Sequence, residues 1–279
     1  AQGINWTFAP MLDISRDPRW GRMVESSGED PFLTEKMAQA YIRGFQGQDL
    51  SSPHSMAATA KHYVGYGAAI GGRDYNTTLI PETELHNVYL RPFRVAAQEG
   101  VATVMSGFNE LNGVPTTANK HTIRHILKDK WQYKGFVVSD WASVKNLSVH
   151  GFTHNDKEAA QKAVVAGVDM DMSSSVYLNN LKKLVEEGTI EETIIDDAVR
   201  RILHVKQALG LFENPYGDAS FPLLSESALD IAKKAVVQST VLLQNKKHIL
   251  PLSNEIQNIA VIGPMADAPN EQMGTWAFD

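Results

Sequence analysis

The chain has 279 residues, of which 43% are hydrophobic and 21% charged, and its formal net charge is −6. This composition is typical of a globular protein with a sizeable core, and the length suits one large barrel or two ordinary domains. Without a basic stripe, nucleic acids and anionic membranes are poor partners. No apolar run approaches the ~20 residues of a membrane span, and the absence of cysteine excludes disulfides and thiolate catalysis.

Residues 1–210 alternate between short apolar runs and helical stretches, which is the pattern of repeated strand–helix–strand units. Each apolar run ends in polar or charged residues. We expect buried parallel strands at 4–14, 56–66, 102–109, 135–141 and 167–172. The sequence therefore predicts an α/β fold, a TIM-type (β/α) barrel over 1–210 whose N-terminal part is missing.

Helix signals lie between and after these runs. Asp30 is a plausible N-cap because Pro31 follows it at the first helical position. Pro92 interrupts the stretch 82–100 and predicts two helical pieces or a kink there. Apolar residues recur at helical spacing over 194–209, and Gly210 stands where a helix C-terminus favours glycine.

The chain changes character after this helix. Residues 211–225 are rich in Pro, Gly and polar residues, and we interpret them as a linker. A helix from about Glu226 to Gln244 and a strand at 259–263 are expected next. Such a strand has few partners, so 226–279 is predicted to be the truncated start of an α/β sandwich domain.

Polar side chains gather at the ends of the predicted strands. In a parallel α/β barrel the active site lies at the carboxyl ends of the strands, where the loops share one open face. Those ends carry Asp13, the pair Lys61-His62, Phe108-Asn109 and Asp140-Trp141. Such a set suits a pyranose, since charged donors bind its hydroxyls, an aromatic ring covers its apolar face, and a carboxylate below the anomeric carbon can attack it.

Several segments resemble glycoside hydrolase family 3, and they follow one another in the family's order. They are FAPMLDISRDPRWGR (8–22), ESSGEDP (25–31), TAKHYVGYG (59–67), VMSGFNELNGVP (104–115), KGFVVSDWASV (134–144), AGVDMDM (166–172), VLLQNKKHILPL (241–252) and IAVIGP (259–264). GGRDYN (71–76) and MGTW (273–276) are similar to the branch of periplasmic β-glucosidases. The resemblance covers nearly the whole chain.

This resemblance implies a retaining, exo-acting β-glucosidase (EC 3.2.1.21) that acts on β-linked oligosaccharides or aryl and alkyl glycosides without metal or cofactor. Asp140, in the SDW motif, is then the nucleophile, and Trp141 and Phe108 are expected to line the first sugar subsite. Arg22, Lys61 and His62 are implied to bind the sugar hydroxyls. A periplasmic or secreted location is also implied, and the oligomeric state is not.

The chain departs from the family pattern in three places. The family's sugar-binding aspartate before the FAP segment is not in this chain. Phe108 stands where many members place a tyrosine beside the nucleophile, so a hydroxyl hydrogen bond is lost. No carboxylate close after Asp140 is a convincing acid/base, which the family usually carries on its second domain or a mobile loop.

Structural interpretations compete with these assignments. Asp140 could cap the next helix, and Lys61-His62 could form a buried pair. Arg22 could belong to a salt-bridge network, and Phe108 could be a core residue. Three other functions also remain: a Schiff-base barrel with Lys61 as nucleophile, a non-catalytic carbohydrate-binding relative, and a β-xylosidase of the same family, because one hydroxymethyl group changes binding by only ~1–3 kcal/mol.

Overall fold

The computed structural model describes residues 3–216, 224–273 and 276. The chain forms two compact units, Ala1–Phe221 and Pro222–Asp279. The predicted linker 211–225 lies partly outside the described residues, at 217–223. Within the described residues, no helix combines the length and apolarity needed to cross a membrane.

A parallel sheet is the centre of the first unit. Its strands are β1 (Thr59–Tyr63), β2 (Thr103–Ser106) and β5 (Phe136–Val138), in the order β1-β2-β5. Single parallel bridges extend this order at both edges, Trp6 to Ala57 and Met11 to Lys61 on one side and Val138 to Met170 on the other. All five predicted runs therefore lie side by side in chain order, although the first and last form bridges rather than full strands.

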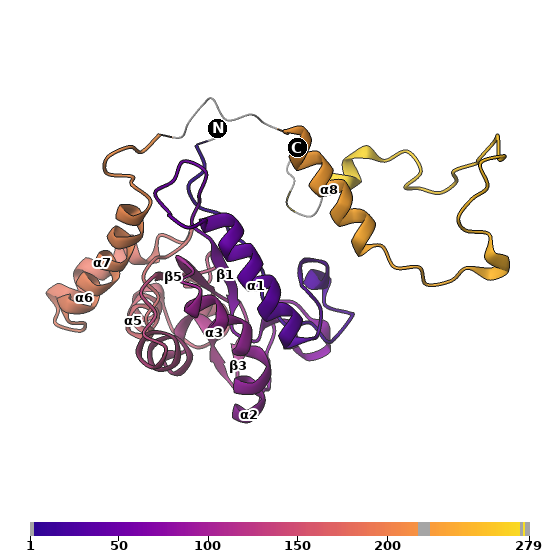
Figure 1. Ribbon diagram of the computed structural model, residues 1–279. Helices are drawn as coiled ribbons and strands as arrows, with labels where there is room; N and C mark the ends of the chain where they lie inside the picture. The colour runs from indigo at the N-terminus through magenta and orange to yellow at the C-terminus, as the bar shows by residue number, and fades with distance from the viewer. Residues whose placement is uncertain (1–2, 217–223, 274–275, 277–279) are drawn as a thin grey trace. The chain divides into compact units, whose positions relative to one another are not determined.

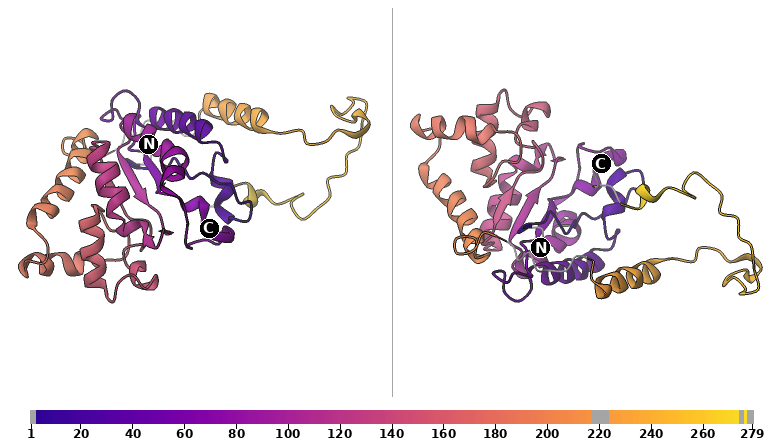
Figure 2. Two further views of the ribbon diagram at one scale, coloured as in Figure 1. Left: turned by 90° about the horizontal axis from the view of Figure 1, so that it is seen from below. Right: turned by 90° about the horizontal axis from the view of Figure 1, so that it is seen from above.

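Helices connect the successive strands (Figures 1 and 2). α1 (Pro31–Gln46) packs against α3 (Arg91–Gln98), and α5 (Asp156–Ala166) against α6 (Val176–Glu186). The other helices and turns are η1 (Gly21–Glu25), η2 (Tyr66–Ala68), η3 (Ile70–Gly72), α2 (Glu82–Glu84), η4 (Leu85–Tyr89), η5 (Thr116–Ala118), η6 (His121–Lys130), α4 (Asn146–Val149) and α7 (Glu192–Ala208). The described residues form an α/β sheet with helices around it and no closed barrel.

The predicted helix ends are confirmed. The Asp30 carboxylate accepts a hydrogen bond from the backbone N–H of Phe32 at 2.9 Å, and Pro31 opens α1. Pro92 stands in the first turn of α3, directly after the π-helical piece η4. Gly210, with φ of 69°, follows the end of α7 in the left-handed conformation that glycine tolerates.

A short hairpin follows β2 and was not predicted. Its strands β3 (Glu110–Leu111) and β4 (Val114–Pro115) pair antiparallel around Asn112 and Gly113, both at positive φ. The amide of Asn112 holds the loop before α2, because it donates to the carbonyl of Ile80 and accepts from the backbone N–H of Ile80.

The second unit consists of α8 (Glu226–Ser239) and the 3-10 turns η7 (Lys246–His248) and η8 (Pro269–Met273). The predicted helix is present but ends five residues early, at Ser239. The predicted strand at 259–263 is wrong: no strand occurs in 224–273. A strand needs a neighbour to bond its backbone groups, and none of these residues offers one. No side chain described in this unit is buried.

Candidate active site

Three strand ends bring two carboxylates and an imidazole together. His62 lies in β1, with Asp13 on the neighbouring edge segment and Asp140 two residues after β5. Nδ1 of His62 is 2.7 Å from Oδ2 of Asp13, and its Nε2 is 3.3 Å from Oδ2 of Asp140. All three residues are buried. The parallel sheet thus assembles a charged row from residues far apart in the sequence.

A second group of charges adjoins this row. The Arg22 guanidinium, in η1, donates to both carboxylate oxygens of Glu25 at 2.7 and 3.1 Å. Nζ of Lys61 is 3.7 Å from the same carboxylate. Burial lowers the pKa of Lys61, while Glu25, Asp140 and Asp13 oppose that shift. Burial would also lower the pKa of Arg22, but Glu25 and other neighbours raise it, so its charge is secure.

Asp140 presents one bonded oxygen and one unbonded oxygen. Oδ1 accepts the backbone N–H of Trp141 at 2.6 Å. Oδ2 is buried and lacks a hydrogen bond of good geometry, although Nε2 of His62 approaches it. A buried polar atom without a hydrogen-bond partner is uncommon in proteins, so this oxygen can accept a bond from, or react with, a bound group. The Trp141 side chain is 66% exposed beside it, so an apolar ring is available to a ligand.

Phe108 belongs to the core rather than to an open wall. It is 6% exposed and clusters with Met11, Trp20 and Tyr66. Its ring also meets Tyr75, with centroids 4.5 Å apart. The competing interpretation of Phe108 as a core residue therefore describes its surroundings better than the subsite wall does.

Two glycines permit the close packing that shapes this region. A Cβ on Gly67 would lie 2.4 Å from the carbonyl oxygen of Ile14, next to Asp13. A Cβ on Gly107 would meet Oδ1 of Asn109 at 2.6 Å and Cβ of His62 at 3.5 Å. A side chain at Gly67 would push against the backbone next to Asp13, and one at Gly107 would displace the Asn109 amide, which lies beside β1.

The structure also identifies neighbours that the sequence did not assign. Glu25 joins Arg22 and Lys61, and the i,i+3 spacing of Glu25 from Arg22 is a signal that would have found it. Asp13 was noted only as a polar strand end. Burial is the main cause that raises the pKa of the half-exposed Tyr75, with Asp74 and Asp140 adding to it, and its ring lies against Tyr66 and Phe108.

The other polar side chains of the loop 16–20 bond within the fold rather than to the site. The Arg19 guanidinium donates a hydrogen bond to Oδ2 of Asp17 at 2.6 Å, and the Arg16 guanidinium donates one to Oε1 of Glu84 at 2.6 Å. Trp20 is buried, and its indole N–H donates to Asp74 at 3.0 Å. These contacts hold the loop that places Arg22.

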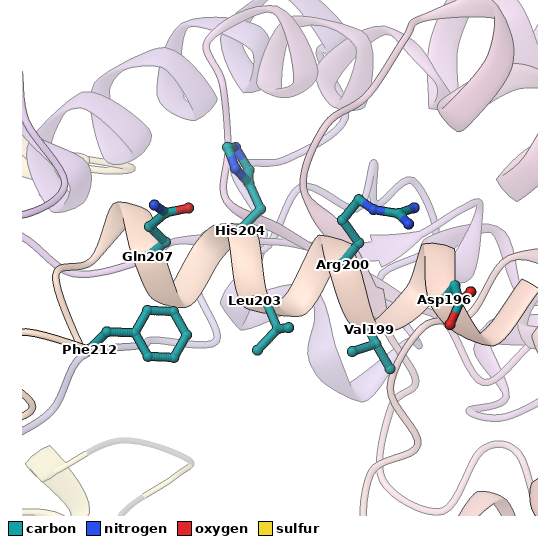
Figure 3. A pocket seen from close by; sticks show the side chains of 7 residues that line it. All are labelled: Asp196, Val199, Arg200, Leu203, His204, Gln207 and Phe212. Carbon is teal, nitrogen blue, oxygen red and sulfur yellow. The ribbon is translucent and has the colours of Figure 1, made fainter. Parts of the chain in front are cut away.

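A separate hollow lies along α7 (Figure 3). Its lining residues are Asp196, Val199, Arg200, Leu203, His204, Gln207 and Phe212. One carboxylate and no predicted site residue face it, so it offers no pair of acids for hydrolysis. Across the described residues, no cluster of three or more His, Cys, Asp or Glu side chains could hold a metal ion.

The arrangement suits a small ligand rich in hydroxyl groups. Arg22 and Lys61 supply charged donors, Asp140 supplies a carboxylate oxygen without a hydrogen bond, and Trp141 supplies an exposed ring. Charged groups fixed in a buried site interact more strongly than in water. The geometry therefore permits nucleophilic attack by Asp140 on a carbon held between these groups.

Comparisons with known proteins relate the chain to glycoside hydrolases. A model of the Glycosyl hydrolase family 3 N terminal domain matches residues 1–205. A periplasmic beta-glucosidase of Salmonella typhimurium is 37% identical over 99% of this chain and 37% of its own length. A beta-xylosidase of Formosa agariphila is 35% identical over 99% of the chain and 40% of its own length.

Solved structures give the same result. A beta-glucosidase from Listeria innocua in complex with glucose has a TM-score of 0.87 and 43% identity, over 90% of this chain and 36% of that one. A beta-glucosidase involved in saponin metabolism from intestinal bacteria has a TM-score of 0.92 and 36% identity, and the match covers 98% of this chain and 37% of that one. The chain thus spans well under half the length of these relatives.

Proposed function

The chain belongs to glycosyl hydrolase family 3, and we propose that it carries the nucleophile of a retaining β-glycosidase that releases terminal β-D-glucose. The observation that carries the proposal is the buried, unbonded Oδ2 of Asp140 beside His62, whose neighbour in β1 is Lys61. Asp140 attacks the anomeric carbon to give a covalent glycosyl-aspartate, and water then releases the sugar.

The other site residues bind and orient the sugar in this proposal. Arg22 and Lys61 donate hydrogen bonds to its hydroxyls, and the ring of Trp141 covers its apolar face. A retaining mechanism also needs a second carboxyl about 5–5.5 Å from the nucleophile. That acid protonates the departing oxygen and later activates water, and it lies outside the residues assigned here.

The proposal extends to architecture and location. Residues 1–210 supply part of a (β/α) barrel, and 226–279 begin an α/β sandwich domain, joined by the linker 211–225. The substrate is a β-linked oligosaccharide or an aryl or alkyl glycoside. The relative named for the periplasm supports a periplasmic or secreted location.

β-Xylosidase activity is the second candidate, because relatives with that name are about as similar in sequence as the β-glucosidases. Both substrates use the same nucleophile, and they differ in one hydroxymethyl group. The two activities are therefore distinguished by rates on paired substrates rather than by the geometry of Asp140.

The test is hydrolysis of 4-nitrophenyl β-D-glucoside and β-D-xyloside by the full-length protein, wild type beside Asp140→Asn. We expect faster turnover of the glucoside and a loss of about 10⁴-fold or more in kcat for the variant, with an unchanged unfolding midpoint. Faster turnover of the xyloside would change the substrate and keep the mechanism. An active Asp140→Asn enzyme would disprove the nucleophile, and a wild type inert on every glycoside would favour a carbohydrate-binding protein.

A further inference from the structure

The carboxylate of Asp13 has no role in the proposed reaction, yet its surroundings are highly organised. Its side chain is fully buried. Oδ2 accepts the backbone N–H of His62 at 3.0 Å and lies 2.7 Å from Nδ1 of the same residue. Oδ1 is buried without a hydrogen-bond partner. One carboxylate oxygen thus fixes both the backbone and the ring of His62.

The two neighbours of the ring define its protonation. An ionised carboxylate only accepts hydrogen bonds, so the close contact with Asp13 requires a proton on Nδ1. Nε2 faces Oδ2 of Asp140 at 3.3 Å. A bare Nε2 would set a lone pair against a carboxylate oxygen, whereas a protonated Nε2 forms an ion pair. The geometry therefore favours His62 as an imidazolium between two carboxylates.

A charge count over the whole cluster supports the same state. The carboxylates in direct contact are Asp13, Glu25 and Asp140, and the cations are Arg22 and Lys61, whose charge Glu25 favours against burial. A charged His62 gives three cations against three anions, which limits the cost of burying them. The ring of Tyr66 packs edge-on to His62 with centroids 5.2 Å apart, and Tyr75 and Asp74 lie beyond Tyr66, where the Asp74 carboxylate accepts the Trp20 indole N–H.

We propose that Asp13 is a positioning residue that keeps His62 doubly protonated and holds its Nε2 beside the nucleophile Asp140. This inference rests on the proposed function. When Asp140 becomes an ester its negative charge is gone, and Asp13 still pairs the imidazolium. The ring therefore keeps its place through both steps of the reaction.

The direct test is nitrogen NMR of the full-length protein with ¹⁵N-labelled histidine rings. The His62 signals are assigned by their loss in His62→Gln. At pH 7 we expect both ring nitrogens of His62 to carry protons in the wild type and in Asp13→Glu, which keeps the charge. Asp13→Asn should lose one of these protons. A single ring proton in the wild type would overturn the proposal, even if no variant folds, and so would an unchanged imidazolium in Asp13→Asn.

Kinetics test the consequence for Asp140. We expect kcat/KM on 4-nitrophenyl β-D-glucoside to fall on the order of a hundredfold in Asp13→Asn, as for other misplaced catalytic groups, with the alkaline limb of the pH profile moved to lower pH. Asp13→Glu should restore the alkaline limb but not the full rate. A variant as fast as the wild type with the same pH profile would contradict a positioning role. A wild-type protein that hydrolyses no glycoside would disprove the proposed function, while the NMR result would still test the protonation of His62.

Discussion

Two buried groups of charges lie at the same sheet, and they differ in how completely they are bonded. In the candidate active site, Oδ1 of Asp13 and Oδ2 of Asp140 have no hydrogen-bond partner. In the pair Lys128–Asp169, Oδ1 of Asp169 accepts Nζ of Lys128 at 2.6 Å and Oδ2 accepts the backbone N–H of Val137 at 2.8 Å. Both side chains of that pair are at most 2% exposed.

The difference reflects what each carboxylate holds in the fold. Asp169 bonds both to Lys128 in η6 and to the backbone of β5. Both of its oxygens therefore hold the strand that leads to Asp140. Burial lowers the pKa of Lys128 to about 8, and Asp169 opposes that shift. Both oxygens of Asp169 are therefore bonded within the fold, whereas Oδ2 of Asp140 keeps no hydrogen bond and is the oxygen that attacks the sugar in the proposed reaction.

The largest effect on stability is expected from Lys128→Met. It leaves the Asp169 carboxylate buried without its cation, which should cost about 3–5 kcal/mol of unfolding free energy. Urea unfolding of the variant beside the wild type measures this loss. The double variant Lys128→Met/Asp169→Asn keeps an acceptor for Val137 without a charge and should recover most of the loss. A single variant as stable as the wild type would show that the pair is not the anchor of β5.

Much of this framework could be predicted from the sequence because it is local. The order of the five runs and the ends of α1, α3 and α7 follow from hydrophobic periodicity and from Pro and Gly. The run 4–14 forms only bridges at Trp6 and Met11, and Pro10 between them has no N–H to donate. The run 167–172 begins with Gly167, which caps α5 instead.

The contacts of the site were harder to predict because they join distant residues. Asp13 and His62 are 49 positions apart, and nothing in their spacing shows that they share a hydrogen bond. The family resemblance assigned Arg22, Lys61, His62 and Asp140 to one site. It did not predict the distances or hydrogen bonds between them. A charged residue inside the apolar run 8–14 was the available signal for Asp13.

A smaller effect is expected from Trp141→Ala, which tests the open side of the site. The backbone N–H that bonds Asp140 remains in the variant, so only the exposed ring is lost. Partial burial of a large apolar side chain is worth about 1.5 kcal/mol, so KM for the glucoside should rise about tenfold. Stability should change by less than about 0.5 kcal/mol, as for other surface substitutions. Trp141→Phe is the matched control and should keep part of the affinity; an unchanged KM in Trp141→Ala would exclude the ring from the subsite.

The smallest effect is expected at the exposed pair Asp17–Arg19, in the same loop as Arg22. Hydrogen bonds from the side chain and backbone of Arg19 lower the pKa of Asp17 from 3.8 to about 2. Because the folded pKa lies below the unfolded one, the pair stabilises the fold above pH 4, and this contribution is lost as the pH falls toward 2. Arg19→Gln removes the side-chain bonds and keeps the backbone one, so the stability curve between pH 4 and 2 should become slightly flatter. High salt should erase the difference between wild type and variant, because exposed charges are screened. A difference that persists in high salt, or a changed kcat/KM, would place Arg19 with the buried charges rather than with the surface.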